Sequence, residues 1–483
     1  MPRLVQTILL TAALSSFTIR TDAAAPTQTY FRSDGGVSQA GVHLPSDLET
    51  PGVLRWKTAL DSGQSTPIVA AGKIFLTTFD PGTKAMNTVA LDAASGRVLW
   101  KTPAPVTRLE EFHPKYGSAA PATPACDGER LFVFFGSYGL ICYDLDGKKL
   151  WDHPMGPFQD EYGAGSSPIL SGDRVIICQD HDIDSFVMAL DRRTGKVLWK
   201  TARPDAVRSY STPVVWNRKD HQELLVAGSL ELSSYEPATG ARLWTTHGLA
   251  RIVIPTPVFA GDMIYVATWA PGGDAGSRIS LGPWSVALEK WDKNKDGRLA
   301  RDEVADPNVL DRFFRMDLDG NGQLDQKEWE RHAEVFTRAQ NAVLALKPSV
   351  THGELPESDL VWKHQRGVPY AASPLLDKNI FWMVKDGGIV TKLDSASGRL
   401  LQEERLRGLG SYYASPVAGD GKVYFASEQG VVTVVANQAE WNVLTSHDFH
   451  EKIYATPLID GGRLVIRTEK AVYCFQEKAD APL

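Results

Sequence analysis

The stretch Ala90-Leu-Asp-Ala-Ala-Ser-Gly-Arg-Val-Leu-Trp100 decides the fold, because it recurs along the chain. A close copy runs from Ala189 to Trp199, and weaker copies end at Trp151, Trp244 and Gly398. In each copy an apolar run ends at an acidic residue, whose carboxylate can accept hydrogen bonds from backbone N–H groups two or three residues further on. The Gly that follows can adopt positive φ and complete a tight turn. The unit is therefore predicted to be a β-hairpin, and in all but the last copy a Trp on its second strand offers a flat packing surface.

A second repeated feature, a small or hydroxyl residue followed by Pro, precedes each hairpin. It occurs at Pro67, Pro124, Pro168, Pro213, Pro257, Pro374, Pro416 and Pro457. The successive intervals are 57, 44, 45, 44, 117, 42 and 41 residues, and most of them match one four-stranded propeller blade. Eight such positions predict eight blades. The last unit lacks its Trp strand, and residues Val53–Lys57 are predicted to supply that strand and close the ring.

The interval of 117 residues exceeds a blade of 44 by 73, and the additional sequence has the apolar spacing of helices. We expect this sequence to form an insertion between the second and third strands of blade five. The predicted division of the chain is a signal peptide at 1–25, propeller at 26–270 and 341–483, and the insertion at 271–340.

Two twelve-residue loops in the insertion fit the EF-hand pattern, in which positions 1, 3 and 5 offer oxygen ligands, position 6 is Gly and position 12 is Glu. The predicted ligands, with position 7 acting through its backbone carbonyl, are Asp292, Asn294, Asp296, Arg298 and Glu303 in the first loop and Asp317, Asp319, Asn321, Gln323, Asp325 and Glu328 in the second. Six or seven oxygens with a bidentate carboxylate favour Ca²⁺ over Mg²⁺, so two Ca²⁺ sites are predicted. The second loop offers more carboxylates and is expected to bind more tightly.

The hairpin unit, written Ala-x-Asp-x-x-Thr-Gly-x-x-x-Trp, resembles the tryptophan-docking motif of pyrroloquinoline-quinone-type propeller repeats over residues 50–270 and 341–476. The resemblance implies a mainly β fold, an eight-bladed propeller similar to that of quinoprotein alcohol dehydrogenases, to which the loops described above add a small α-helical EF-hand insertion in blade five. It also implies that a set of Trp residues packs between adjacent blades, namely Trp56, Trp100, Trp151, Trp199, Trp244 and Trp362.

Two functions from different classes follow from this resemblance. The first is that of the outer-membrane assembly propellers, and we expect a non-enzymatic binding or scaffold protein whose partner is a protein, a small molecule or a glycan. The second is a dehydrogenase that uses pyrroloquinoline quinone and an active-site Ca²⁺. Family dehydrogenases carry adjacent Cys residues beneath the quinone, and this chain has no Cys-Cys pair. The quinone is therefore not expected and no catalytic residue is predicted, while an unrecognised hydrolase or lyase stays open.

Aromatic residues precede several of the Pro positions, where the inner strand of a blade begins. Tyr210, Tyr370, Tyr413 and Tyr454 are candidates for a ring around one mouth of the central channel, where they would stack on a planar or sugar-like ligand. The alternative, favoured on the residues alone, is that each Tyr packs between inner strands. The acidic loop Gln179–Ser185 would suit a metal or acid–base chemistry, but its spacing matches no known site, and a solvated hairpin tip is predicted.

Composition and charge limit the partners. The chain has 51 Lys and Arg against 58 Asp and Glu, a net charge of −7, which argues against electrostatic binding of nucleic acid. Arg3, the apolar run Leu4–Ile19 and the small residues before Pro26 predict an export signal. We expect a monomer in the periplasm or the extracellular space, without a membrane-spanning helix, because no apolar run is long enough. Cys142, Cys178 and Cys474 lie in apolar strands and are predicted to be buried thiols, although a disulfide stays open.

Overall fold

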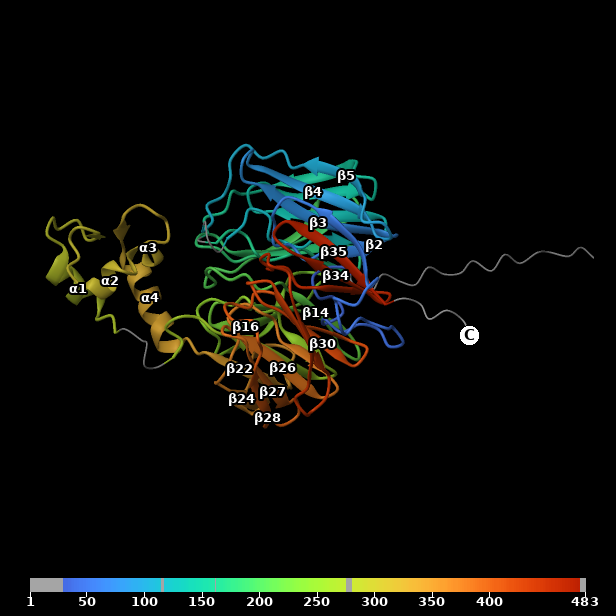
Figure 1. The fold of residues 1–483 in the computed structure, drawn as a ribbon. Helices are drawn as coiled ribbons and strands as arrows, with labels where there is room; N and C mark the ends of the chain where they lie inside the picture. Colours follow the sequence, from blue (N-terminus) through green and yellow to red (C-terminus); the bar gives the residue numbers. More distant parts are fainter. Residues whose placement is uncertain (1–28, 114–116, 161, 275–279, 478–483) are drawn as a thin grey trace, which may run out of the picture.

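The computed structural model describes residues 29–113, 117–160, 162–274 and 280–477, so the predicted signal peptide lies outside the described residues. The chain forms eight antiparallel sheets that follow one another as the blades of a propeller (Figure 1). The first four blades contain β2 (Ile68–Ala70), β3 (Lys73–Asp80), β4 (Ala85–Asp92) and β5 (Val98–Pro103); β6 (Ala125–Cys126), β7 (Arg130–Phe135), β8 (Gly139–Asp144) and β9 (Lys149–Pro154); β10 (Ile169–Ser171), β11 (Arg174–Gln179), β12 (Phe186–Asp191) and β13 (Val197–Ala202); and β14 (Val214–Asn217), β15 (Gln222–Gly228), β16 (Glu231–Tyr235) and β17 (Arg242–His247).

The last four blades contain β18 (Val258–Ala260), β19 (Met263–Thr268), β22 (Ala342–Leu346) and β24 (Leu360–His364); β25 (Leu375–Asp377), β26 (Ile380–Lys385), β27 (Ile389–Asp394) and β28 (Leu400–Arg405); β29 (Val417–Gly419), β30 (Lys422–Ala426), β31 (Val431–Ala436) and β32 (Val443–Asp448); and β33 (Leu458–Asp460), β34 (Arg463–Arg467), β35 (Ala471–Gln476) and β1 (Leu54–Ala59). A short strand, β23 (Gly353–Glu354), adds to blade four parallel to β17, next to a 3₁₀ turn at Glu357–Asp359.

The ring closes as the sequence predicts. β1, from the N-terminal part of the chain, pairs antiparallel with β35 and opposes Trp56 to Cys474. The eighth blade therefore takes its outer strand from one end of the chain and the other three from the opposite end. Because β1 pairs with β35, the edge of β35 is not left unpaired, and the eighth blade has four strands.

Apolar strands in the middle of each blade are buried on both faces. Along β7, Leu131 and Val133 pack toward blade one, whereas Phe132 and Phe134 pack toward blade three. The alternation follows from the period of two in a strand. Adjacent blades therefore share the core between them. The four Cys side chains are buried in these layers and are free thiols.

Five of the six predicted Trp residues lie on the hairpin turn of the next blade. The indole N–H of Trp199, for example, donates to the carbonyl of Pro237 at 3.0 Å, and a Cβ on Gly240 would come within 2.4 Å of the Trp199 ring. Gly240 has φ of +73°, so both the turn and the ring need glycine there. The corresponding indole bonds join Trp56 to Ala93, Trp100 to Leu145, Trp151 to Arg192 and Trp362 to Ser395.

Trp244 differs from this prediction. Its indole N–H donates to Glu223 Oε2 at 2.6 Å within its own blade, and the side chain is fully buried. The next blade offers no Ser/Thr-Gly hairpin for it, because residues 347–359 form a longer connection between β22 and β24. Trp216 makes the contact between these two blades instead, donating to the carbonyl of Gly261 at 2.9 Å.

A helical lobe lies between β19 and β22, the second and third strands of blade five (Figure 1). It consists of α1 (Trp284–Trp291), β20 (Leu299–Ala300), α2 (Pro307–Leu310), α3 (Phe313–Met316), β21 (Gln323–Leu324) and α4 (Gln326–Arg338). The lobe has its own apolar cluster, in which Trp329 packs against Trp284 and Trp291. None of the described helices is long and apolar enough to cross a bilayer.

The lobe also contacts the ring. Arg331 on α4 donates to the carbonyl of Pro204 at 2.9 Å, and Arg338 lies 2.8 Å from His247 Nδ1. Gln159, from the connection between blades two and three, donates to the carbonyl of Leu318 at 2.8 Å. The lobe is therefore positioned against blades three and four.

The segment before β1 crosses the channel. The carbonyl of Thr29 accepts from Cys126 N in blade two at 2.7 Å, and Ser38 N donates to Ala418 O in blade seven at 2.8 Å. Between them, Arg32 donates to the carbonyls of Pro416 and Pro374 at 2.9 and 2.7 Å. All four ring partners follow the repeated hydroxyl positions, so the segment lies against the beginning of the inner strands of blades two, six and seven.

Candidate functional site

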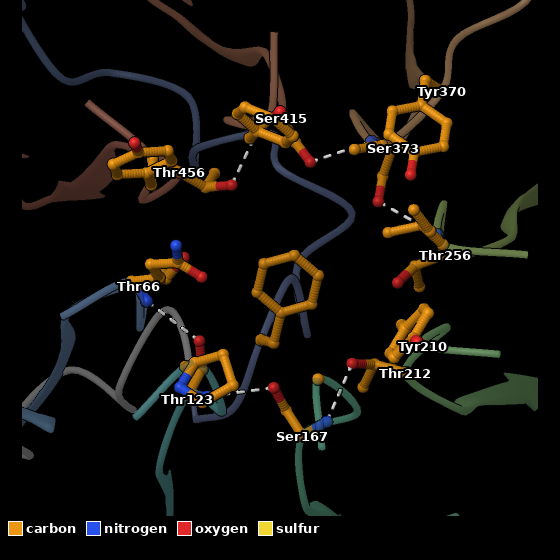
Figure 2. Close-up of a pocket in the computed structure, with 18 of the residues that line it drawn as sticks. Thr66, Thr123, Ser167, Tyr210, Thr212, Thr256, Tyr370, Ser373, Ser415 and Thr456 are labelled. Atoms are coloured by element: carbon orange, nitrogen blue, oxygen red, sulfur yellow. Dashed lines mark hydrogen bonds between the residues drawn. The ribbon is translucent and has the colours of Figure 1, made fainter. Parts of the chain in front are cut away.

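Hydroxyl residues directly before the repeated Pro positions form a belt around the channel (Figure 2). At six of the eight junctions the hydroxyl of one blade accepts from the backbone N–H of the preceding blade at 2.9–3.1 Å. The acceptors are Thr123, Ser167, Thr212, Ser373, Ser415 and Thr456. Buried backbone N–H groups need acceptors, and here the neighbouring blade supplies them. The belt therefore links adjacent blades by hydrogen bonds.

The belt lines a cavity of about 390 Å³, and aromatic side chains form the rim of this cavity. The four predicted Tyr residues all line it, together with Tyr162 and Trp269. Tyr413 and Tyr454 lie with ring centroids 5.6 Å apart, and Trp269 meets Tyr370 edge-on at 5.5 Å. The four rings therefore line one cavity of the channel, and Tyr210 is at the same time buried. Phe31 of the crossing segment also lines the cavity.

The cavity offers little for acid–base chemistry. Asp386 is the one carboxylate among its described lining residues, and Ser411 and the backbone of Tyr412 donate to it at 3.3 and 3.0 Å. Burial raises the pKa of this carboxyl above its ordinary value. Six hydroxyls of the lining already accept from the backbone. The arrangement suits binding of a ring-shaped ligand by stacking and hydrogen bonds.

Two buried acids lie behind the wall formed by Tyr210. Asp160 accepts from the Tyr210 hydroxyl at 2.5 Å, and burial raises the pKa of Asp160 to about 7. Glu110 accepts from Ala164 N at 3.2 Å, and burial together with the charge of Asp160 raises the pKa of Glu110 to about 8. Neither acid lines the cavity. Sequence reasoning missed this pair, because the two residues come from different inter-blade connections and no local motif marks them.

The acidic loop at 179–185 is exposed only at Ile183 and Asp184, so the sequence prediction of a solvated hairpin tip is wrong for the other residues of the loop. Asp180 and Asp182 are buried, and each is bound by two nitrogens of one Arg. Arg203 reaches Asp180 at 2.7 and 3.0 Å, and Arg208 reaches Asp182 at 2.5 and 2.7 Å. Paired guanidinium–carboxylate contacts of this geometry satisfy buried charges. His181 is also buried, which lowers its pKa to about 4. Most of the loop is therefore buried, whereas Ile183 and Asp184 at its tip are exposed.

The two loops of the helical lobe have matching geometry. In the first, Gly297 N donates to Asp292 Oδ2 at 3.0 Å, and in the second Gly322 N donates to Asp317 Oδ2 at 2.8 Å. The loops are joined by the short strands β20 and β21, which oppose Leu299 to Leu324. Around each loop further backbone N–H groups donate to the side chains of Asn294, Asp296, Asp319 and Asn321.

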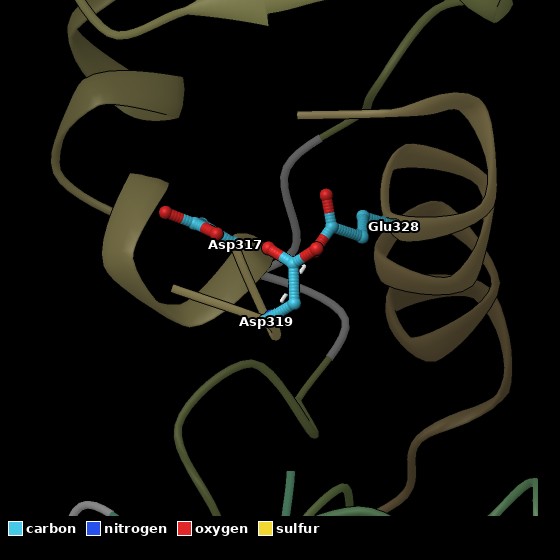
Figure 3. Close-up of side chains that lie close together, drawn as sticks. All are labelled: Asp317, Asp319 and Glu328. Atoms are coloured by element: carbon cyan, nitrogen blue, oxygen red, sulfur yellow. Dashed lines mark hydrogen bonds between the residues drawn. The ribbon is translucent and has the colours of Figure 1, made fainter. Parts of the chain in front are cut away.

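Carboxylates converge most closely in the second loop (Figure 3). Oxygens of Asp317, Asp319 and Glu328 all lie within 4.8 Å of one another. Glu328 belongs to α4, and its Oε1 accepts from Leu318 N at 2.7 Å, so the helix start folds back over the loop. Asp325 caps this helix by accepting from Glu328 N at 2.9 Å. In the first loop Glu303 is likewise buried and accepts from Lys293 N at 3.1 Å.

Among the described residues that line the channel cavity, few could ligate the Ca²⁺ of a quinoprotein dehydrogenase and none is a cation that would pair with the carboxylates of its quinone. Ca²⁺ takes six to eight oxygen ligands, usually with several carboxylates, and the described lining provides only Asp386. Pyrroloquinoline quinone carries carboxylates, and no Lys or Arg is among the described residues that line the cavity. The four thiols are buried within the blades and include no adjacent pair.

Known proteins support the fold and the repeat type. Among solved structures, the chain is similar to BamB from Moraxella catarrhalis with a TM-score of 0.55 and 12% identity, covering 88% of this chain and 99% of that one. It is also similar to a europium-containing methanol dehydrogenase with a TM-score of 0.51 and 12% identity, covering 90% of this chain and 88% of that one. These likenesses establish a propeller of the quinoprotein type.

Comparison of sequences identifies the family of the chain. It is 25% identical over 178 residues to quinohemoprotein alcohol dehydrogenase ADH IIB of Pseudomonas putida, a match covering 33% of this chain and 24% of that protein. The chain thus spans about a quarter of that relative's length. The pyrroloquinoline-quinone-type repeat family described as outer membrane protein assembly factor BamB matches residues 46–181 and 183–481. The match covers most of the chain, which therefore belongs to this family.

Proposed function

We propose that this protein is an exported, calcium-binding propeller that acts as a non-enzymatic binding or scaffold protein. The observation that carries the proposal is the pair of coupled loops with their convergent carboxylates. The second observation is the cavity at the channel mouth, which has an aromatic rim and only one carboxylate among its described lining residues. Family membership supports a protein partner, since one similar structure is a BamB protein.

Each loop of the lobe would hold one Ca²⁺ as an EF-hand. The second site would use the carboxylates of Asp317, Asp319 and Glu328, the Asn321 side chain and the Gln323 carbonyl, with Asp325 at position 9, often bridged by water. The first would use Asp292, Asn294, Asp296, Glu303 and the Arg298 carbonyl. In the second loop three carboxylates already meet within 4.8 Å, a repulsive arrangement that a divalent cation would stabilise.

A structural role for Ca²⁺ follows from the contact between lobe and ring. Leu318, inside the second loop, accepts from Gln159 of the ring, and Arg331 on the helix that carries Glu328 reaches Pro204. Ordering this loop would therefore fix the lobe against blades three and four. An exported protein meets no cytosolic calcium pulses, so permanent occupancy suits this site better than sensing.

The channel mouth would bind a planar or sugar-like ligand. Tyr210, Tyr370, Tyr413 and Tyr454 would provide the stacking surfaces, and free lone pairs on the hydroxyl belt would accept hydrogen bonds. The sequence identity with an alcohol dehydrogenase favours one competing function, oxidation through bound quinone. The two functions differ in whether the cavity retains the quinone.

Incubation of the purified chain with pyrroloquinoline quinone and Ca²⁺ tests the proposed function. We expect no stoichiometric quinone absorption after gel filtration and no dye-linked oxidation of alcohols. Calcium should occupy the lobe in the same sample as long as Ca²⁺ is present in the gel-filtration buffer. Retained quinone together with alcohol oxidation would replace the binding function with the dehydrogenase.

A further inference from the structure

A second cavity, of about 310 Å³, lies between the helical lobe and the ring. The ring contributes Arg251 from the connection after β17 and a segment that follows β19, and the lobe contributes side chains around α2, α3 and α4. The residues that line this arginine cleft are Arg251, Trp269, Pro271, Gly272, Asp274, Arg312, Arg315 and His332. It is built by two parts of the chain that meet only because the lobe is positioned against the ring.

The arginine cleft has an excess of positive charge. Three guanidinium groups line it, and Asp274 is the one carboxylate among its described lining residues. His332 is buried, and its pKa is lowered to about 3 by burial and by the surrounding Arg side chains, so its imidazole is neutral at pH 7. Arg251 is also buried. Guanidinium groups in a partly desolvated cleft bind carboxylates and phosphates well, because their N–H groups match two oxygens at once.

The arginine cleft adjoins the channel mouth. Trp269 lines both cavities, and on the channel side it meets Tyr370 edge-on. A ligand ring resting against Trp269 would therefore lie beside the residue that the channel mouth shares with the arginine cleft. The aromatic rim would provide stacking, and the arginines would provide charge.

We propose that the arginine cleft binds the oxyanion group, carboxylate or phosphate, of a small ligand whose ring rests against Trp269 in the channel mouth. The inference deepens the proposed function, because it assigns an acidic character to the ligand of the channel. Arg312 and Arg315 come from the lobe, so the lobe contributes directly to ligand binding. Neutral ligands of the same shape would lose this interaction.

Calorimetric titration of the full chain in saturating Ca²⁺ tests the inference with four probes: inorganic phosphate, glucose 6-phosphate, glucuronate and glucose. We expect glucose 6-phosphate or glucuronate to bind at least tenfold more tightly than glucose. Comparison of these two probes shows whether the site prefers a phosphate or a carboxylate. Arg312→Gln and Arg315→Gln should each weaken that probe at least tenfold. Both side chains are partly exposed, so these variants are expected to fold, and Arg97→Gln on an exposed hairpin is the matched control.

The outcomes separate the two proposals. If phosphate alone binds and loses affinity in Arg312→Gln and Arg315→Gln, while the sugar adds nothing, the oxyanion site is supported and the channel-mouth ligand fails. If acidic probes bind no more tightly than glucose, or if the two variants match Arg97→Gln with every acidic probe, the arginine cleft is not an oxyanion site.

Discussion

Replacing Glu110 by Gln should remove a large part of the pH dependence of stability. Glu110 is buried between blades, accepts from Ala164 N at 3.2 Å, and has no hydrogen-bond partner for Oε1 among the described residues. Ala164 N can donate equally to an amide oxygen. The substitution therefore keeps the shape and the backbone hydrogen bond and removes only the ionisation.

The magnitude follows from the pKa. Burial and the neighbouring Asp160 raise the pKa of Glu110 from 4.5 to about 8, whereas the unfolded chain ionises near the ordinary value. Between these values the folded state holds a proton that the unfolded state has lost, so stability falls as pH rises. Each pKa unit corresponds to about 1.36 kcal/mol, so the loss across this range is on the order of 5 kcal/mol. Below pH 4.5 this contribution is fully retained.

Denaturant unfolding at a series of pH values, followed by Trp fluorescence, measures the effect. Wild type and Glu110→Gln should be similar near pH 4.5, and the variant should become the more stable one as pH approaches 8. Glu111→Gln, at the exposed neighbouring residue, is the matched control and should follow wild type. Parallel pH curves for Glu110→Gln and wild type would show that Glu110 is not a buried, protonated acid.

Further predictions concern the ring. Trp199→Ala should lower stability by about 2–4 kcal/mol, because it removes the indole ring that packs against Gly240. Trp199→Phe keeps an aromatic ring there and should cost less. Equal denaturation midpoints for Trp199→Ala and wild type would contradict the docking role. Ser373→Ala should cost about 1–3 kcal/mol because Thr256 N loses its acceptor, which chemical denaturation would detect and an unchanged midpoint would contradict. Deleting residues 53–57 should lower the melting temperature of the whole propeller, since β35 loses its partner strand; an unchanged melting temperature would argue against closure by β1.

Local chemistry explains why the propeller could be predicted from the sequence. Asp191 accepts from Thr194 N at 2.8 Å and Gly195 takes a φ of +71°, so the hairpin is determined within a few residues. Repetition of this unit and of the Pro positions then gives eight blades. The closing strand was predictable because the last unit lacks its own Trp strand.

Features that depend on contacts between residues distant in the sequence could not be predicted in the same way. Asp180 and Asp182 looked solvated because their partners, Arg203 and Arg208, lie beyond the next two strands of the blade. The Trp244 indole donates to the buried carboxylate of Glu223 and does not pack on a hairpin turn, because the following blade has a longer connection at that place. The arginine cleft likewise exists only once the lobe meets the ring.

Calorimetric titration with Ca²⁺ tests the central claim, calcium binding by the helical lobe, most directly. The full chain should bind two Ca²⁺, with affinities near the range of about 10⁻⁴–10⁻³ M that is common in extracellular modules. Glu328→Gln should abolish the tighter site and Glu303→Gln the weaker one, whereas Glu330→Gln, exposed on the same helix as Glu328, should leave both sites unchanged. A tighter site that survives Glu328→Gln, or a wild-type chain that binds no Ca²⁺, would contradict the account.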